Sequence, residues 1–430
     1  MPGLILAAPS SGAGKTTVTL ALLRLLSRLG LDVRGAKSGP DYIDPRFHEA
    51  ACGASCVNLD AWAMSPERLI SLAAGPELLI IEGAMGLFDG APPEGRGAVA
   101  DLARLMALPV VLVVDAARMA QSVAPLVAGF AAHDPAVRVA GVILNNVGSA
   151  RHAGMLRAAL APLGLPVLAA LPRRADLALP SRHLGLVQAG ENPDLAAFLD
   201  RAADALAAGG AGDEATDLEA LLSLSTPLPD VPDLDPSARL NPPAQTIAIA
   251  RDEAFAFTYP HMLNDWRAAG AELRFFSPLA DHAVPQADFV FLPGGYPELH
   301  AGRIARAATF LATLRRHGDH RPIYGECGGY MVLGDVLFDS DNTPHQMAGL
   351  LPLATSFKTQ RLHLGYRTLT ATTGPFPGRH RAHEFHYATT LHKGGAPLFE
   401  ATDATGAALP PMGIREGQIC GSFAHIIDRG

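Results

Sequence analysis

Residues with the types and spacing for phosphate chemistry lie near the N-terminus, where residues 10–17 read SSGAGKTT. An apolar run precedes this string and a helical pattern follows it, so a small-residue loop joins a strand to a helix. Glycines let the backbone N–H groups of such a loop converge on phosphates, and the helix N-terminus adds a favourable potential. Lys15 would reach the β- and γ-phosphates, and the Thr16 hydroxyl would ligate Mg²⁺. The loop predicts a nucleotide site formed by Ser11, Gly12, Ala13, Gly14, Lys15, Thr16 and Thr17.

Further strand ends carry side chains that could serve the same nucleotide. Lys37 is a candidate phosphate contact, and Asp41 and Asp44 are candidate Mg²⁺ ligands, because ligands bind at the carboxyl ends of strands in open α/β sheets. A solvated turn with aspartate caps is the alternative for this loop. Glu82 ends an apolar strand and would be the hard oxygen ligand beside the nucleotide. Asn145 follows another strand and could bond a base edge or cap a turn.

A second kind of chemistry is indicated by Cys327, which lies between Gly325 and Gly329 in the string GECGGY. A strand before it and a helical stretch after it predict a nucleophile elbow, which presents a side chain between small neighbours. The helix N-terminus would lower the pKa of the thiol, and the Gly328 N–H could join an oxyanion hole. His425 follows a C-terminal strand and could be the base. Other histidines leave this choice open: His363, His380, His383, His386 and His392.

The elements that must position these residues form two α/β units. Apolar strands alternate with helical stretches over the first 200 residues, which predicts a parallel sheet with helices on both faces. Gly, Ala, Asp and Pro dominate residues 207–245 and periodicity fades, which indicates a linker or a surface excursion. A second series of strands begins at residue 246 and leads to the cysteine elbow.

Composition limits the class of protein. The chain has 430 residues, of which 49% are hydrophobic and 18% charged, which suits large buried cores. The net charge of −8 argues against a nucleic-acid partner. No apolar run approaches the roughly 20 residues needed to span a bilayer, and no basic segment precedes the first apolar run as in a signal peptide. Four scattered cysteines do not form a disulfide framework. We expect a cytoplasmic protein without a membrane partner.

The motifs of both halves resemble known families. GECGGY and the terminal GSFAHI look like a class I glutamine amidotransferase domain, and LPGGYPE resembles the loop that supplies its oxyanion hole. SSGAGKTT, KSGPDYIDPRFH and IEGAMGLFDG look like the dethiobiotin-synthetase-like ATP-dependent ligases. The order of the halves, together with VVDAARMAQSVAPLV, GVILNNVGSARH, LPSRHLGLV and HEFHY, is similar to the cobyrinic or hydrogenobyrinic acid a,c-diamide synthases.

This resemblance implies an ATP-binding amide-ligase domain over residues 1–206, a linker over 207–245 and a glutamine amidotransferase domain over 246–430. It implies that MgATP turns two acetate carboxylates of a corrinoid or hydrogenobyrinate macrocycle into acyl phosphates, which ammonia from L-glutamine converts to amides. A homodimer is a further expectation. The implied residues are Thr16, Asp44 and Glu82 for Mg²⁺, Lys15 and Lys37 for phosphates, Cys327 with His425 as the glutaminase pair, and Gly294, Gly295 and Gly328 for the oxyanion. Tyr42, Arg46 and His48 are candidates for contact with the macrocycle because they follow the predicted metal loop.

Two positions depart from these patterns. Pro9 replaces the leading glycine of the phosphate loop, which would reshape it slightly. Ile427 stands where many class I amidotransferases have a glutamate that orients the histidine, so this group is missing or comes from elsewhere. The alternatives are a nickel-sirohydrochlorin a,c-diamide synthase, a cobyric acid synthase and, more remotely, a partitioning-ATPase-type switch. The elbow at Cys327 speaks against the switch.

Overall fold

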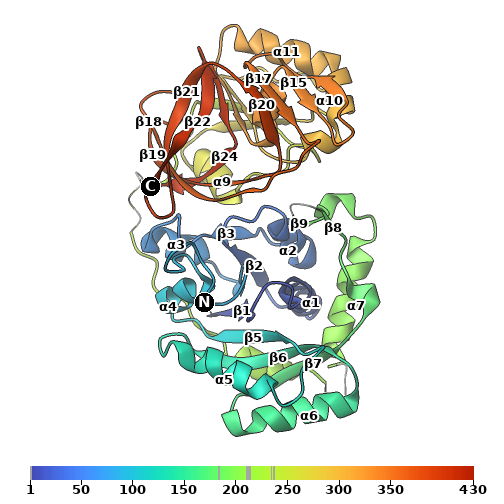
Figure 1. Ribbon diagram of the computed structural model, residues 1–430. Helices are drawn as coiled ribbons and strands as arrows, with labels where there is room; N and C mark the ends of the chain where they lie inside the picture. Colours follow the sequence, from blue (N-terminus) through green and yellow to red (C-terminus); the bar gives the residue numbers. More distant parts are fainter. Residues whose placement is uncertain (1, 183–184, 210–214, 234, 236–237) are drawn as a thin grey trace. The chain divides into compact units, whose positions relative to one another are not determined.

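The computed structural model describes residues 2–182, 185–209, 215–233, 235 and 238–430. The chain divides into two compact units, Met1–Leu234 and Asp235–Gly430 (Figure 1). Both units combine helices with a sheet that contains parallel strands, which confirms the predicted α/β class with two domains.

The first unit is built on a largely parallel sheet with the strand order β3-β2-β4-β1-β5-β6-β7. Its central strands are apolar and fully buried, as expected for strands covered on both faces. A short antiparallel strand, β10, pairs with the beginning of β1. The strand bounds are β1 Pro2–Ala7, β2 Val33–Ser38, β3 Val57–Leu59, β4 Leu78–Glu82, β5 Val110–Asp115, β6 Val139–Val147, β7 Val167–Pro172 and β10 Thr226–Pro227.

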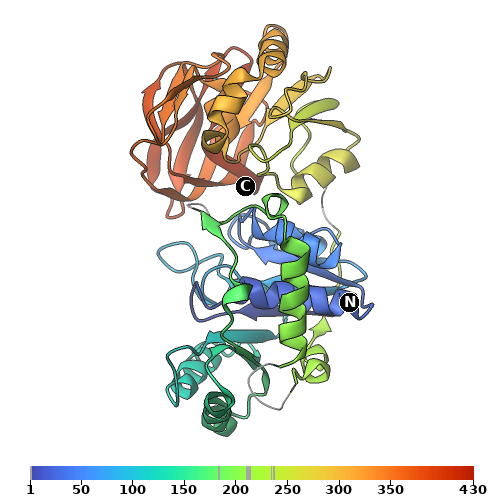
Figure 2. The ribbon, with the colours of Figure 1, turned by 90° about the vertical axis from the view of Figure 1, so that its right-hand side faces the viewer.

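Helices connect these strands and pack against one another. Helix α1 contacts both α2 and α7, whereas α5 contacts α6. Figures 1 and 2 show α7 as a long green helix at the side of this unit. The helix bounds are α1 Lys15–Arg28, α2 Asp44–Cys52, α3 Pro66–Ala73, α4 Val99–Met106, α5 Val123–His133, α6 Ala150–Leu160, α7 Leu195–Ala207 and α8 Leu218–Ser223; β8 Ser181–Arg182 and β9 Gly185–Leu186 form a short hairpin.

The segment predicted as a linker is more ordered than its composition indicates. Helix α8 buries Leu221 completely, and β10 adds to the sheet of the first unit, which extends to Leu234. The sequence does not predict these elements, because a segment rich in alanine, proline and aspartate has little apolar periodicity. Residues 210–214, 234, 236 and 237 of the predicted linker lie outside the described residues. The boundaries at 206 and 246 stay predictions.

The second unit has a mixed sheet with the order β12-β11-β13-β14-β23-β22-β21-β18-β19-β24. The strands from β12 to β23 pair in parallel, and the pairs from β23 to β24 are antiparallel. The strand bounds are β11 Thr246–Ala250, β12 Glu272–Phe276, β13 Phe289–Leu292, β14 Ile323–Glu326, β18 His363–Ala371, β19 Gly378–His386, β21 Ala396–Asp403, β22 Ala408–Glu416, β23 Ile419–Ser422 and β24 Ala424–Arg429.

A small sheet and four helices complete the second unit. The small sheet has the order β16-β15-β17-β20. Buried aromatic side chains fill the core, with the rings of Trp266 and Phe291 5.9 Å apart. The remaining bounds are β15 Val336–Phe338, β16 Pro344–Gln346, β17 Leu353–Ser356, β20 Thr389–Lys393, α9 Pro260–Ala268, α10 Ala301–Arg306, α11 Ala308–Gly318 and α12 Gly328–Leu333.

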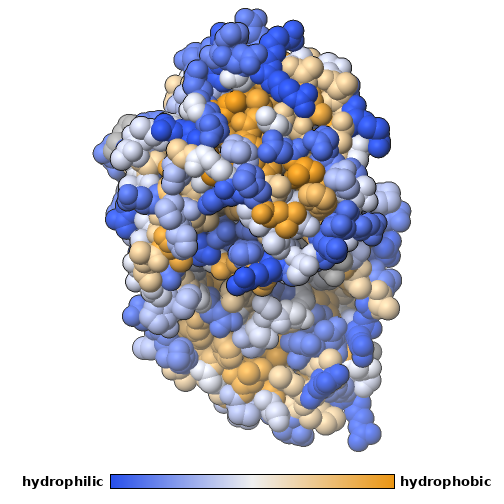
Figure 3. All heavy atoms as spheres, turned by 45° about the horizontal axis from the view of Figure 1, so that its top comes forward, coloured by the Kyte–Doolittle hydropathy of each residue, from blue (hydrophilic) through white to orange (hydrophobic). Residues whose placement is uncertain are grey.

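The surface mixes polar and apolar side chains. On the face that Figure 3 shows, hydrophilic side chains surround separate hydrophobic patches. Across the described residues, no helix combines the length and the apolar character needed to cross a bilayer.

Candidate functional sites

The phosphate loop lies between β1 and α1, as predicted. Gly14 adopts the left-handed conformation with a φ of 85° at the helix start. A Cβ atom there would lie 2.1 Å from Nδ2 of Asn145, so this position requires glycine. Asn145 donates a hydrogen bond from Nδ2 to the Ala13 carbonyl at 3.0 Å, and Lys15 donates from Nζ to the Met85 carbonyl at 2.5 Å. The structure therefore places the Asn145 side chain against the loop that leads to Lys15.

The three residues predicted to hold Mg²⁺ converge. The Thr16 hydroxyl lies 2.6 Å from Oε1 of Glu82 and 3.4 Å from Oδ2 of Asp44. Lys37 reaches the same carboxylates, with Nζ 2.5 Å from Asp44 and 2.8 Å from Glu82. Lys37 and Glu82 are opposite each other on β2 and β4, so the parallel sheet sets this contact. The donor set fits Mg²⁺, which prefers hard oxygen ligands.

The buried charged groups of Asp44, Glu82 and Lys37, here called the metal cradle, shift one another's pKa values. Burial opposes the charge on Lys37, but Asp44 and Glu82 raise its pKa above the usual value. Burial would raise the pKa of Glu82, yet Lys37 and His48 hold it well below the usual range. Burial and the nearby Asp41 raise the pKa of Asp44 to about 7. Lys37 contacts both carboxylates and His48 contacts Glu82, and a divalent cation would favour the ionised form of Asp44.

A cavity of about 300 Å³ lies on one side of the phosphate loop. Its wall includes Gly12, Gly14, Thr17 and Asn145, which were predicted nucleotide contacts. Ser11 is exposed at the loop tip, and Ala13 is buried. Arg174 also lines this cavity, a residue that the sequence reasoning missed because it lies in an irregular segment after β7. The cavity therefore adjoins the residues that the sequence predicts for nucleotide binding.

The three macrocycle candidates from the sequence lie in different environments. His48 is completely buried, with Nε2 2.6 Å from Oε2 of Glu82 and Nδ1 3.4 Å from Sγ of Cys56. This position does not favour contact with a macrocycle; it places the imidazole behind a carboxylate of the metal cradle. Arg46 is half-buried and pairs with Glu49 at 2.8 Å, and Tyr42 is half-buried.

The cysteine elbow has the predicted shape. Cys327 follows β14 directly and precedes α12, with φ 46° and ψ −102°, a conformation that is rare for a non-glycine residue. Its N–H donates to the Ser422 carbonyl at 2.8 Å. A Cβ at Gly329 would lie 1.9 Å from the Leu292 carbonyl oxygen, so the turn closes only with glycine there. Such a strained turn is typical of a nucleophile held by its surroundings.

His425 and the LPGGYPE loop meet at this cysteine. A Cβ on Gly294 would lie 2.3 Å from Cε1 of His425 and 3.3 Å from Cβ of Cys327. A Cβ on Gly328 would lie 3.1 Å from the backbone nitrogen of Gly295. The structure thus brings together all five residues predicted for the glutaminase site, with two backbone nitrogens at the place expected for an oxyanion hole.

The carboxylate of Glu326, which the sequence reasoning missed, lies beside the imidazole of His425. Oε2 of this carboxylate lies 3.6 Å from Nδ1 of His425, and both side chains are buried. Oε1 of Glu326 accepts the N–H of Ile426 at 3.1 Å. The sequence feature that could have indicated this carboxylate is the acidic residue directly before Cys327 in GECGGY. It takes the place that Ile427 leaves without a carboxylate.

The pKa of the Cys327 thiol differs from the sequence expectation. Burial raises it well above the ordinary value, and the carboxylates of Glu298, Glu326 and Glu384 add to the shift, while the Gly328 N–H opposes it. The Gly328 N–H at the start of α12 lowers this pKa as predicted, but burial outweighs it, so the predicted net lowering is wrong. The resting cysteine is a protonated thiol.

The other histidines have different partners. His383 lies opposite His425 on the neighbouring strand, and burial together with the His425 and Arg367 charges lowers its pKa to about 3. His380 is buried against the Phe376 carbonyl, and His392 is exposed on β20. Among the candidates, His425 is therefore the one that packs against the loop at Cys327.

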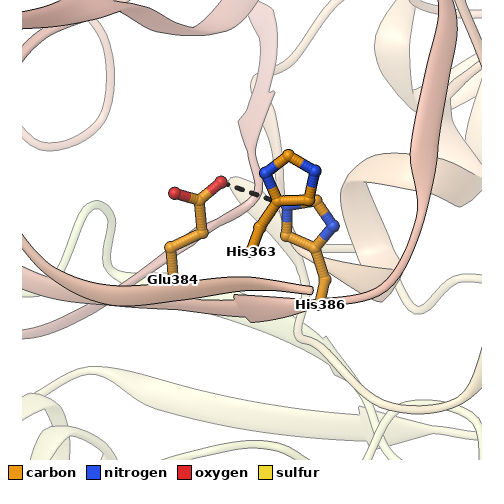
Figure 4. Close-up of side chains that lie close together, drawn as sticks. All are labelled: His363, Glu384 and His386. Atoms are coloured by element: carbon orange, nitrogen blue, oxygen red, sulfur yellow. Dashed lines mark hydrogen bonds and ion pairs between the residues drawn. The ribbon is translucent and has the colours of Figure 1, made fainter. Parts of the chain in front are cut away.

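His363, Glu384 and His386 form a polar cluster on β18 and β19 (Figure 4). The rings of His363 and His386 stack with centroids 4.6 Å apart, and Nε2 of His386 lies 3.1 Å from Oε1 of Glu384. Arg367 pairs with the other oxygen of Glu384 at 2.8 Å. Although burial opposes ionisation, His386 and Arg367 lower the pKa of Glu384 to about 2. Arg367 balances the charge of Glu384, but Nδ1 of the buried His386 has no hydrogen-bond partner among the described residues.

Both halves of the chain match known protein families. Residues 4–187 match the family described as the CobQ/CobB/MinD/ParA nucleotide binding domain, and residues 246–429 match the CobB/CobQ-like glutamine amidotransferase domain. A hydrogenobyrinate a,c-diamide synthase of Rhizobium meliloti (strain 1021) is 53% identical over 436 residues, which cover 100% of this chain and 99% of that protein.

Two further hydrogenobyrinate a,c-diamide synthases are similar to this chain to the same degree. That of Brucella anthropi is 52% identical, with 100% of this chain and 99% of that protein covered. That of Rhodobacter capsulatus is 53% identical, with 99% and 98% covered. The similarity spans the phosphate loop, the metal cradle and the cysteine elbow alike. The chain therefore belongs to the hydrogenobyrinate a,c-diamide synthase family.

Proposed function

We propose that this protein converts the a and c acetate carboxylates of hydrogenobyrinate to amides, with MgATP activating each carboxylate and glutamine supplying nitrogen. The observation that carries the proposal is the presence of two sites in one chain. One is the phosphate loop with the oxygen ligands of Thr16, Asp44 and Glu82, and the other is the elbow that holds Cys327 beside His425. The relatives named for this activity match over nearly the whole length.

Glutamine hydrolysis begins with the Cys327 sulfur adding to the side-chain amide carbon of glutamine. The N–H groups of Gly295 and Gly328 stabilise the oxyanion. His425 takes the thiol proton and gives it to the departing ammonia, which leaves a γ-glutamyl thioester on Cys327. His425 then removes a proton from water, which attacks the thioester, and glutamate leaves as the thiol is restored. Because the thiol is protonated at rest, proton transfer must accompany the attack.

Amidation needs an activated carboxylate, because a carboxylate ion is a poor electrophile without a good leaving group. The macrocycle carboxylate oxygen attacks the γ-phosphorus of ATP, the bond to the β–γ bridging oxygen breaks, and an acyl phosphate and ADP form. Ammonia adds to the acyl carbon and loses a proton, and inorganic phosphate leaves. Lys15 at the end of the phosphate loop and Lys37 beside Asp44 would neutralise phosphate oxygens. Thr16, Asp44 and Glu82 would hold Mg²⁺, which neutralises phosphate charge when bound.

The test is an assay of purified protein with hydrogenobyrinate, MgATP and glutamine, followed by mass spectrometry of the macrocycle. We expect a product in which two carboxylates have become amides, with one ADP and one glutamate formed for each amide. Separate reactions with cobyrinate and with nickel-sirohydrochlorin measure the substrates that the sequence left open. Amidation that proceeds without ATP, or glutamate release without any amide product, would contradict the proposal.

A further inference from the structure

Helix α5 presents an unusual surface for its composition. Its sequence VAPLVAGFAAH is apolar up to the last residue, yet Val123 and Val127 are its only buried residues. Pro125 and Gly129 are exposed, and Phe130 is half-buried. Figure 1 shows α5 beside α6 at the edge of the first unit. A helix that is apolar all round is normally buried, so we expect a ligand or a partner to cover this exposed face.

The exposed face of α5 forms one wall of a cavity of about 410 Å³. Phe88, from the loop after β4, and Pro9 also line this cavity. The rings of Phe88 and Phe130 stack with centroids 5.8 Å apart, and His133 packs edge-on against Phe88 at 4.5 Å. We name these residues the α5 groove. It offers aromatic and aliphatic surface of the kind that suits the face of a flat conjugated ring.

The α5 groove adjoins the phosphate loop. Pro9 belongs to both, and the Leu87 N–H donates to the Ala8 carbonyl at 2.9 Å, so the loop that carries Phe88 is fixed to the start of the phosphate loop. Asp89 also holds this loop by accepting the Gly86 N–H at 2.9 Å. The carbonyl of Met85 in the same loop accepts the bond from Lys15. The groove therefore begins next to the lysine that would hold the γ-phosphate.

A second cavity of about 310 Å³ continues the groove along the phosphate loop. It shares Pro9 and Leu126 with the first cavity and adds the exposed cation Arg118 and the carboxylate of Asp115, while Asp89 lines the first cavity. The cavity near Asn145 is lined by different residues. A ligand in the α5 groove would therefore leave that cavity free, with a cation at hand for its carboxylates.

We propose that the α5 groove binds one face of the macrocyclic substrate, a flat, conjugated polycarboxylate, and brings an acetate arm to the γ-phosphate. This inference rests on the proposed function. The ring stacks against Phe88 and Phe130, and Arg118 pairs with a peripheral carboxylate. A second copy of the chain could also cover an apolar helix, but the aromatic wall, the cation and the place beside Lys15 favour the substrate. Tyr42, Arg46 and His48 are not among the described residues that line these two cavities.

The experiment measures equilibrium binding of hydrogenobyrinate to the full chain by dialysis and absorbance, alongside ATP affinity and sedimentation. Phe130→Ala should weaken macrocycle binding about 10- to 100-fold, as loss of one aromatic stacking partner does. Phe130→Trp should retain binding, and Arg118→Ala should weaken it more at low salt than at high salt. Met155→Ala, an exposed apolar residue on α6, is the matched control and should bind as wild type.

Each outcome separates the two proposals. Wild-type protein that binds no hydrogenobyrinate overturns the proposed function and the groove assignment with it. Wild-type protein that binds the macrocycle, with Phe130→Ala equal to it, overturns the groove assignment alone. A Phe130→Ala variant that changes the sedimentation of the protein but not its macrocycle affinity assigns the groove to a second copy, and likewise overturns it. Weaker macrocycle binding with unchanged ATP affinity supports the inference.

Discussion

Replacing Glu326 by glutamine tests how His425 is oriented. The Glu326 carboxylate lies 3.6 Å from Nδ1 of His425 in a buried site. The substitution removes the negative charge but keeps an oxygen that can accept the Ile426 N–H, now bonded at 3.1 Å. The elbow should therefore keep its fold, while the imidazolium that forms during catalysis loses its counter-charge.

The size of the effect follows from this distance. Two unit charges 3.6 Å apart interact by about 4 to 5 kcal/mol at an effective dielectric constant of about 20. At about 1.36 kcal/mol for each factor of ten in rate, the upper limit is about three orders of magnitude. The orienting aspartate of a Ser-His-Asp triad contributes about 10⁴-fold when replaced by asparagine. We expect the glutaminase kcat of Glu326→Gln to fall by about 10²- to 10³-fold.

The assay is glutamate release from glutamine, with ammonia-dependent amidation as the internal reference, which should not change. Glu298→Gln is the matched control, because Glu298 and Glu326 both raise the pKa of Cys327 but Glu326 pairs with His425. Alkylation of Cys327 by iodoacetamide should not slow in either variant, since each removes a charge that opposes the thiolate. A Glu326→Gln protein whose glutaminase kcat stays within about threefold of wild type would refute this reasoning.

Three further predictions concern other parts of the two sites. Glu82→Gln removes a carboxylate of the metal cradle, so amidation with glutamine or ammonia should collapse while glutamine hydrolysis without ATP persists; loss of hydrolysis alone would overturn this role. The pKa of the Cys327 thiol is raised above its ordinary 9.0, so the rate of its alkylation should still rise with pH at pH 9.0. Peptide mass spectrometry locates the alkylation at Cys327. A rate that reaches a plateau near neutral pH would disprove the shift. In Gly294→Ala the added Cβ would lie 2.3 Å from Cε1 of His425, so the glutaminase rate should fall about 100-fold or more with ATP affinity intact; unchanged turnover would show that His425 can move aside.

Chemistry located at strand ends could be predicted from the sequence. Parallel strands bring their carboxyl ends to one edge of a sheet, so Thr16, Asp44 and Glu82 could be expected to meet, and they do. The elbow at Cys327 was readable because glycines on both sides leave few other conformations. In these places local sequence and global topology point to the same geometry.

Features that depend on what surrounds a side chain could not be predicted. His48 follows the metal loop in sequence, but its helix turns the ring inward to Glu82, where burial is complete. The raised pKa of Cys327 depends on burial and on carboxylates from distant segments. The sequence pattern points to position 427 for a partner of His425, whereas the carboxylate near it belongs to Glu326, on another strand. Such contacts are set by tertiary packing, which no single motif encodes.

The central claim is that one chain holds separate sites for ammonia release and for amidation. The most direct measurement compares hydrogenobyrinate amidation by wild type and by Cys327→Ser, each with MgATP and either glutamine or ammonium chloride. The account predicts that Cys327→Ser forms no amide from glutamine but matches wild type with ammonium chloride, because the thiol acts only on glutamine. A variant that is equally inactive with both nitrogen sources, while still folded and able to bind ATP, would contradict it.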